Sequence, residues 1–297
     1  MGLFSRLKTG FGMVRRSSHA LRVHPKLLIF PLVGGLSGIA FLVTLFGSLY
    51  VTDSFFQEPG VVVYGALFVA YLVETFIASF FTAALVAATR TVFEGEEPSI
   101  RRALAVAWQR KLPLIIWSLI AAIIGVFIRM IESEGNLVAQ IIAGVFAVAW
   151  SVMTYFVVPV IVFRNPSLRG MLSESASTFK DTWGESLGAM DTIDMFSFLL
   201  ALLGLVLGVL TFVVPAGMGA IQLPATVLIG GTAFIFGLLI GKALSGVAKT
   251  ALDVYATEST APEFFDDMDF SGVSGDKPPS TGGFGNRFGG SGGGSQI

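Results

Sequence analysis

Long apolar stretches separated by short polar connections form the main pattern along this chain. Each stretch is close to or above the ~20 residues that an α-helix needs to cross a bilayer. The predicted spans are Leu27–Val51, Val61–Ala88, Leu112–Ile131, Leu137–Phe163, Met195–Val214 and Ala225–Leu252. The pattern therefore predicts an all-α, polytopic membrane protein with six transmembrane helices arranged as three hairpins, in a membrane domain over residues 27–252.

Two connections between the spans carry an amphipathic pattern that occurs twice. The first copy reads PSIRRAL from Pro98 and the second reads PSLRGML from Pro166. Apolar residues at helical spacing predict amphipathic helices near 98–111 and 167–186, in the cytoplasmic interface of the membrane. Ser99 and Ser167 are the expected N-caps. The residues expected to face lipid or the bundle are Ile100, Leu104, Trp108, Leu168, Leu172, Phe179 and Trp183.

The two ends of the chain differ from its apolar middle. Residues 1–26 are basic with apolar residues at roughly helical spacing, which predicts a cytoplasmic helix on an anionic membrane surface. A frayed basic tail is the alternative. Residues 253–270 form an acidic cytoplasmic segment, and residues 271–297 are rich in glycine and serine. The last segment is expected to be disordered because it cannot bury enough apolar surface to fold.

Basic residues show which side of the membrane each connection faces. Lys and Arg occur before the first span and in the connections 90–111 and 164–194, whereas the connections 52–60, 132–136 and 215–224 contain none. Basic residues favour the cytoplasmic side of a membrane. Both termini are therefore expected in the cytoplasm, in a multi-pass protein of the plasma membrane.

Composition agrees with a membrane protein and argues against an enzyme. Apolar residues make up 54% of the chain and charged ones 13%, whereas about a quarter of the residues in soluble domains are charged. The chain has no cysteine and two histidines, His19 and His24. Neither the HExxH nor the GxSxG pattern of metal and serine hydrolases occurs inside a predicted span. We expect no enzymatic activity, no catalytic, metal-binding or cofactor-binding residue, and no nucleic-acid partner.

Two ionisable residues fall inside predicted spans, Glu74 in the second and Lys242 in the sixth. Such residues usually face the interior of a bundle and have partners. Both spans run from outside to inside, and the two residues differ in depth by about one helical turn. We therefore predict that the two spans are neighbours and that Glu74 and Lys242 pair. The alternative is a protonated Glu74 and a Lys242 that reaches toward the cytoplasm.

Glycine and proline predict details of helix packing. The GxxxG pattern allows helices to approach closely in lipid, and contacts within the bundle are favoured over self-association into a homo-oligomer. Pro159 should bend the fourth span because it cannot donate the helical hydrogen bond to the carbonyl four residues earlier. A gating hinge is the alternative interpretation of this bend. The GxxxG pairs are Gly34/Gly38, Gly204/Gly208 and Gly237/Gly241.

Four segments together resemble a family of uncharacterised six-span membrane proteins from archaea and bacteria. They are HPKLLIFPLVGG, FFTAALVAATRTVFEGEEPSIRRAL, VVPVIVFRNPSLRGMLSESASTFKDTWGE and TALDVYATESTAPEFF, within residues 15–265. More distantly, the chain resembles the membrane regions attached to some glycerophosphodiester phosphodiesterases. The family carries no established activity, so the resemblance implies no catalytic residue. The acidic segment is compatible with an archaeal source.

Two functions agree with this pattern. The first is a membrane-organising or partner-binding protein whose cytoplasmic helices and tail recruit protein partners. The second is a transporter or channel for a small solute, with Glu74 and Lys242 as an intramembrane charge pair. The organising role is favoured because the spans contain few polar groups, whereas a transport path normally places several there.

Overall fold

The computed structural model consists of helices, and its described part contains no strand. It describes residues 3–52, 59–133, 136–164, 166–183, 222–258 and 261–266, together with Leu202 and Val206. In chain order the elements are α1 (Leu3–Val23), η1 (Pro25–Leu28), α2 (Ile29–Val51), α4 (Pro59–Phe93), α5 (Ile100–Gln109), α6 (Lys111–Ser133), α7 (Leu137–Thr154), α8 (Val157–Arg164), α9 (Leu168–Trp183) and α11 (Gln222–Glu258). The predicted all-α fold class is confirmed.

Five helical stretches within the described residues are long and apolar enough to cross a bilayer. They are Pro25–Val51, Val62–Phe93, Lys111–Ser133, Leu137–Arg164 and Gly230–Glu258. These stretches correspond to the predicted first, second, third, fourth and sixth spans. The predicted fifth span, Met195–Val214, lies outside the described residues except for two positions, and so does the predicted disordered tail 271–297. A polytopic membrane protein is confirmed, while the count of six spans stays a prediction.

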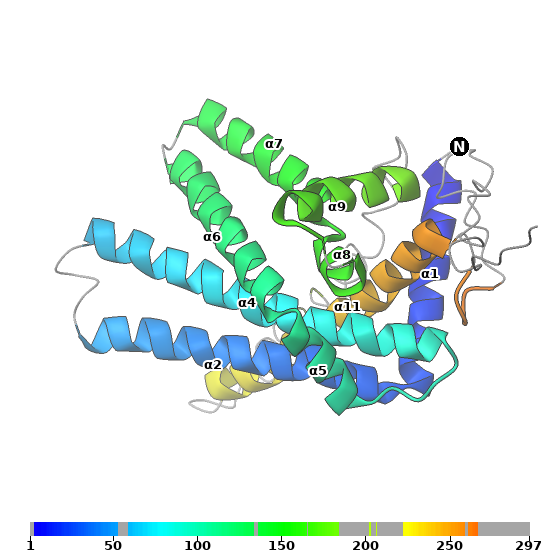
Figure 1. Cartoon of the computed structure of the whole chain (residues 1–297). Helices are drawn as coiled ribbons and strands as arrows, with labels where there is room; N and C mark the ends of the chain where they lie inside the picture. The colour runs from blue at the N-terminus through cyan, green and yellow to red at the C-terminus, as the bar shows by residue number, and fades with distance from the viewer. Residues whose placement is uncertain are drawn as a thin grey trace, which may run out of the picture.

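The helix α4 is the element around which the others are arranged. It lies beside α2, and it also contacts α5, α6, α8 and α11. The helix α7 packs on α6 and on α9. Figure 1 shows α2 and α4 side by side, with α1 standing across one end of the pair. The helix α1 thus lies at one end of the pair formed by α2 and α4.

The fourth span is interrupted where proline removes a helical hydrogen bond. The helix α7 ends and α8 begins around Tyr155 and Phe156. Pro159 has no N–H to donate to the carbonyl of Tyr155, and its ring crowds that carbonyl. At the break, the Phe156 N–H donates to the buried hydroxyl of Ser175 in α9 at 3.0 Å. The predicted bend at Pro159 is confirmed, and the break becomes the point where α9 attaches.

Both predicted surface helices begin at a serine cap. The Arg102 N–H donates to Ser99 Oγ at 3.5 Å, at the start of α5. The Gly170 N–H donates to Ser167 Oγ at 3.2 Å, at the start of α9. A serine cap of this kind is worth roughly 1 kcal/mol because it satisfies an amide that the helix leaves unpaired. The two predicted N-caps are confirmed.

The helix α5 packs on α4 through small residues. Ala103 and Ala107 are buried, and Ile100 and Leu104 are partly buried against the same core. Trp108 is 59% exposed. Alanine allows two helices to approach closely, and the Trp108 ring meets Phe80 of α4 edge to face, with ring centres 6.3 Å apart. Ile100 and Leu104 therefore pack on the bundle, and the role of these residues and Trp108 as interfacial anchors stays a prediction.

The helix α9 faces the bundle with a mixed polar and apolar surface. Its buried residues are Met171, Ser175, Thr178 and Phe179. Leu172 is partly buried against the core. The side chains of the other two predicted anchors, Leu168 and Trp183, lie outside the described residues. Serine and threonine occupy half of the buried positions because they bind polar atoms of neighbouring helices, which an amphipathic pattern does not reveal.

The helix α1 packs against protein with one face, while its predicted contact with an anionic membrane surface stays a prediction. It contacts α11, and its described inner face is buried. That face consists of Met13, Val14, Ser17, Ala20 and Leu21. The helix α11 continues to Glu258, beyond the predicted end of its span at Leu252, and its buried apolar residues extend to Val254.

The segment 261–266 folds back on the same region. Phe265 is fully buried and meets Phe93 edge to face, with ring centres 5.8 Å apart. Phe264 meets the rings of His19 and His24 at 5.6 and 6.1 Å. The acidic segment predicted for residues 253–270 is therefore partly helix α11 and partly a packed turn.

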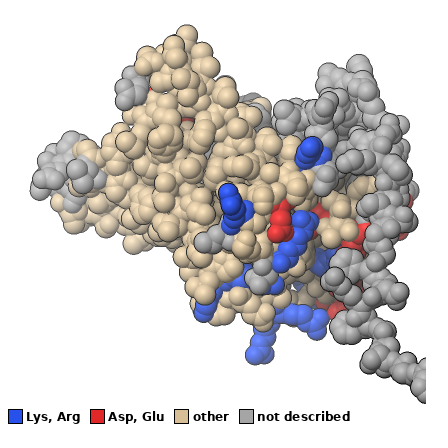
Figure 2. Space-filling view, turned by 45° about the horizontal axis from the view of Figure 1, so that its top comes forward, with Lys and Arg blue, Asp and Glu red and all other residues tan. Residues whose placement is uncertain are grey.

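Charged side chains gather at one end of the molecule. Figure 2 shows the blue and red atoms gathered in one part of this face, while the opposite part is tan. Lipid-exposed surfaces avoid charge because ions are costly to place in hydrocarbon. The charge distribution therefore separates a membrane part from a polar end.

Candidate functional site

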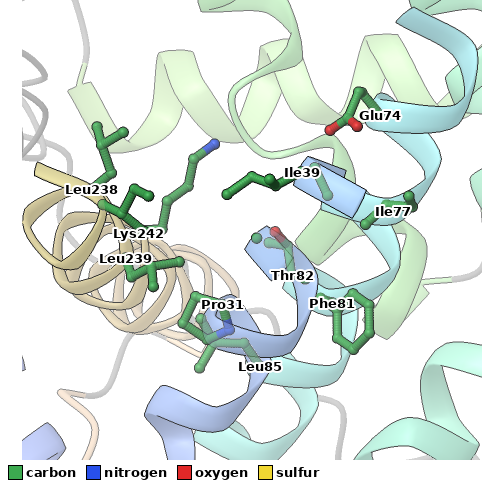
Figure 3. Close-up of a pocket in the computed structure, with 14 residues that line it drawn as sticks. Pro31, Ile39, Glu74, Ile77, Phe81, Thr82, Leu85, Leu238, Leu239 and Lys242 are labelled. Atoms are coloured by element: carbon green, nitrogen blue, oxygen red, sulfur yellow. The ribbon is translucent and has the colours of Figure 1, made fainter. Parts of the chain in front are cut away.

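A cavity of about 280 Å³ lies between α2, α4 and α11, in the membrane part of the protein. Figure 3 shows its walls, with α11 on one side and α2 and α4 on the other. Most of the lining is apolar, and the side chains that depart from this are Glu74, Thr82 and Lys242. Apolar cavities with a small number of placed polar groups are the usual form of a small-molecule site.

Glu74 places a carboxylate against the backbone of α2. A Cβ atom built on Gly38 would lie 2.6 Å from Glu74 Oε2, so the carboxylate occupies the space that glycine leaves free. Its Oε1 atom is buried and has no hydrogen-bond partner among the described residues. An ionisable side chain near the membrane centre costs on the order of 3 kcal/mol on insertion scales. The described residues around Glu74 therefore do not offset the free-energy cost of placing this ionisable group in the membrane.

Lys242 extends from α11 on the other side of the cavity. Figure 3 shows its amine and the Glu74 carboxylate directed to the same side of the cavity, with Ile39 between them in this view. The described residues contain no ion pair that involves either side chain. The expected contact between α4 and α11 is observed. The predicted Glu74–Lys242 pair is not formed as a direct contact. Similar depth in the membrane does not determine the distance between two side chains within the membrane plane.

Three glycines of α2 determine how closely the cavity walls approach. A Cβ atom on Gly34 would lie 3.0 Å from Phe81 Cβ, and one on Gly35 would lie 2.8 Å from Leu239 Cδ2. Together with Gly38, they let α4 and α11 pack on α2 at short distance. The predicted use of the Gly34/Gly38 motif for contacts within the bundle is confirmed. Gly237 and Gly241 of α11 are buried, and Gly204/Gly208 lies outside the described residues.

A second polar cluster lies at the charged end, around Arg164 at the end of α8. Arg164 Nη2 lies 2.8 Å from Asp253 Oδ1 of α11, and the Asp253 side chain is 4% exposed. Nη1 donates to Thr178 Oγ1 of α9 at 2.8 Å, and Nη2 also donates to Thr257 Oγ1 at 3.0 Å. One guanidinium group thus joins three helices. Sequence analysis missed this cluster because its members are up to 93 positions apart.

Arg90 makes a related connection between α4 and α11. Its Nε donates to Glu94 Oε1 at 2.7 Å, its Nη2 pairs with Glu258 at the end of α11, and its guanidinium lies 5.9 Å from the centre of the Phe163 ring. The two helices that carry Glu74 and Lys242 are therefore tied together at their polar ends. This arrangement supports the geometry of the cavity and offers no reacting group of its own.

The described residues contain no group of three His, Cys, Asp or Glu side chains placed to hold a metal ion. His19 and His24 both lie against Phe264, in the packed polar end. The expected absence of catalytic, metal and cofactor sites stays a prediction.

Comparison with known proteins gives a family for the chain. A model described as a family of unknown function (DUF6159) matches residues 61–263. The matched range includes Glu74, Lys242 and both polar clusters. No curated protein and no solved structure is similar to the chain. The resemblance to membrane regions of glycerophosphodiester phosphodiesterases and the archaeal source stay predictions. Because the match covers more than half of the sequence, the chain belongs to the DUF6159 family of unknown function.

Proposed function

We propose that this integral membrane protein binds a small solute in the cavity between α2, α4 and α11. The observation that carries the proposal is the buried Glu74 Oε1 atom, which lines this cavity without a partner among the described residues. Buried polar groups are normally satisfied, and an unsatisfied one in a native structure requires an explanation. A ligand that donates to Glu74 supplies that explanation.

The position of the cavity favours a transport-related role over a purely structural one. Its lining comes from the first half of α2, from the middle and second half of α4, and from α11 around Lys242. Secondary transporters hold their substrates near the middle of the bilayer, where helices of different repeats meet. The cavity is slightly smaller than the roughly 300–1,000 Å³ of drug-sized ligand sites, which favours a small solute.

The organising function favoured by the sequence pattern has less support. It assigns the recruitment of protein partners to the cytoplasmic helices and the tail. The described faces of α1, α5 and α9 are largely buried within the chain. Recruitment of protein partners by the tail, and self-association, remain predictions.

The binding site predicts a change in the small molecules that stay with the purified protein. Ala78 is exposed and lines the cavity, so Ala78→Phe should fill the space that a ligand needs. We expect native mass spectrometry of the full-length protein to show a bound small molecule that Ala78→Phe loses. The matched control is Ala149→Phe, at an exposed position of α7 that does not line the cavity. Identical spectra for the three proteins would contradict the proposal.

The proposal also places both termini in the cytoplasm, supported by the Lys and Arg residues of the polar end. Arg129, at the opposite end of α6, is 59% exposed and pairs with Glu132 at 2.9 Å, so its charge is balanced locally. Reporters of sidedness fused after Ile297 and inserted at Glu58 should indicate opposite compartments. The same compartment for both would mean that the number of spans between them differs from the predicted one.

A further inference from the structure

An acidic and a basic side chain line the proposed binding cavity without touching each other. Glu74 belongs to α4 and Lys242 to α11. A salt bridge requires a nitrogen and an oxygen within about 4 Å, and the described residues contain no such pair for either side chain. Figure 3 shows both charged ends reaching the same side of the cavity from different walls.

We propose that the ligand of this cavity is a small zwitterion with an apolar body, whose ammonium group binds Glu74 and whose anionic group binds Lys242. This inference rests on the proposed function, since it names the chemical class that the same cavity takes.

The glycine of α2 explains why the two side chains need a third partner. The Glu74 carboxylate lies in the space above Gly38 that any Cβ atom would fill, since that atom would be 2.6 Å from Oε2. It therefore lies against α2, and the described part of the structure contains no ion pair between it and Lys242. A ligand placed between the walls can reach both groups at once.

Net charge argues against a ligand with a single charge. A cation would compensate Glu74 and leave Lys242 without a counter-ion at membrane depth, and an anion would do the reverse. Uncompensated charge in the membrane is costly. A zwitterion compensates both groups and leaves the occupied cavity with no net charge.

The rest of the lining selects an apolar body. Ile77 and Phe81 of α4 and Leu239 of α11 line the cavity beside the charged groups. Ile39, Ile235 and Leu238 also line it, and they are 43%, 36% and 41% exposed. Within the described residues the cavity is therefore open at the side of the bundle. Two sources carry the required chemistry, a free apolar amino acid and the head of a zwitterionic phospholipid.

The test measures binding of matched probes to the full-length protein in a non-ionic detergent. Leucine is the zwitterion, leucinamide keeps the ammonium alone, 4-methylpentanoate keeps the carboxylate alone, and 4-methylpentanamide has no charge. A second set compares lysophosphatidylethanolamine with lysophosphatidylglycerol of the same acyl chain. We expect one zwitterion to bind at least about tenfold more tightly than its singly charged analogues, which corresponds to about 1.4 kcal/mol. The set in which this preference occurs identifies the source.

Two variants distinguish a ligand contact from a structural role. Glu74→Gln should weaken binding of the zwitterion and the cation but leave binding of the anion unchanged. Lys242→Met should weaken binding of the zwitterion and the anion but leave binding of the cation unchanged. Arg129→Gln, outside the cavity, should change none of them. A purely structural role would weaken all probes equally in both variants.

Other results would overturn the inference in distinguishable ways. Equal binding of singly charged and zwitterionic probes, or no binding of any probe, would reject the zwitterion class. If Ala78→Phe still removed a co-purified molecule, the proposed binding function would stand without that class. If Ala78→Phe also had no effect, both proposals would fail. Recovery of lost stability in the Glu74→Gln/Lys242→Met double variant, without probe binding, would instead show a direct pair.

Discussion

Replacing Arg164 with methionine should destabilise the protein by about 3–5 kcal/mol, since breaking a buried ion pair leaves its partner uncompensated. That partner is Asp253, which is 4% exposed and lies 2.8 Å from the guanidinium group. The variant also removes the donors to Thr178 and Thr257. We expect unfolding in mixed micelles to occur at a lower denaturant concentration, with faster hydrogen exchange in α9.

Two further variants isolate the cause of this loss. Arg102→Met removes the exposed pair between Arg102 and Glu96, whose side chains are 68% and 61% exposed, and surface pairs of this kind contribute about 0.2–1 kcal/mol. The double variant Arg164→Met/Asp253→Leu should recover much of the stability, because it leaves no unpaired charge. A loss no larger than that of Arg102→Met would show that Arg164 does not hold α8, α9 and α11 together.

The second large effect is expected at the contact between α2 and α4. Gly34→Leu should destabilise the protein by roughly 1–3 kcal/mol or more, the range for overpacking in a close-packed interior. Even the first added carbon would lie 3.0 Å from Phe81 Cβ and 3.1 Å from two atoms of its ring. A backbone-proximal Cβ atom cannot move away without shifting α4. Unfolding in mixed micelles measures the loss.

Gly47→Leu is the matched control on the same helix. A Cβ atom at Gly47 has no neighbour within 4 Å, so the larger side chain meets open space. Leucine also favours a helix over glycine by about 0.8 kcal/mol in water, so we expect little change or a small gain. If both variants lose stability equally, the loss comes from the removal of glycine in general and the close contact at Gly34 is refuted.

Local rules predicted several features of the fold correctly. The lengths of the apolar stretches predicted five spans that the structure contains. Pro159 predicted the break between α7 and α8. Ser99 and Ser167 predicted where two helices begin. Each of these depends on residues close together in sequence. Such features follow from hydrogen bonds and side-chain periodicity within one helix.

Features that depend on distant residues were not predictable in the same way. Arg164 and Asp253 are 89 positions apart, and nothing near either residue indicates the other. The packing of α1 on α11 was not predictable either, because an amphipathic pattern suits a membrane surface and a protein surface equally well. For Glu74 and Lys242, residue positions along the spans predicted similar depth and neighbouring helices. These positions did not predict that the two side chains are separated across the cavity, where the Glu74 carboxylate lies in the space beside Gly38.

The central claim is that Glu74 and Lys242 act on a molecule held between them. An electron cryo-microscopy structure of the full-length protein, extracted with its native lipids, tests this most directly. The account predicts non-protein density in the cavity, in contact with the Glu74 carboxylate on one side and the Lys242 amine on the other. A cavity without such density, in which the amine lies within about 4 Å of the carboxylate as a direct salt bridge, would contradict it.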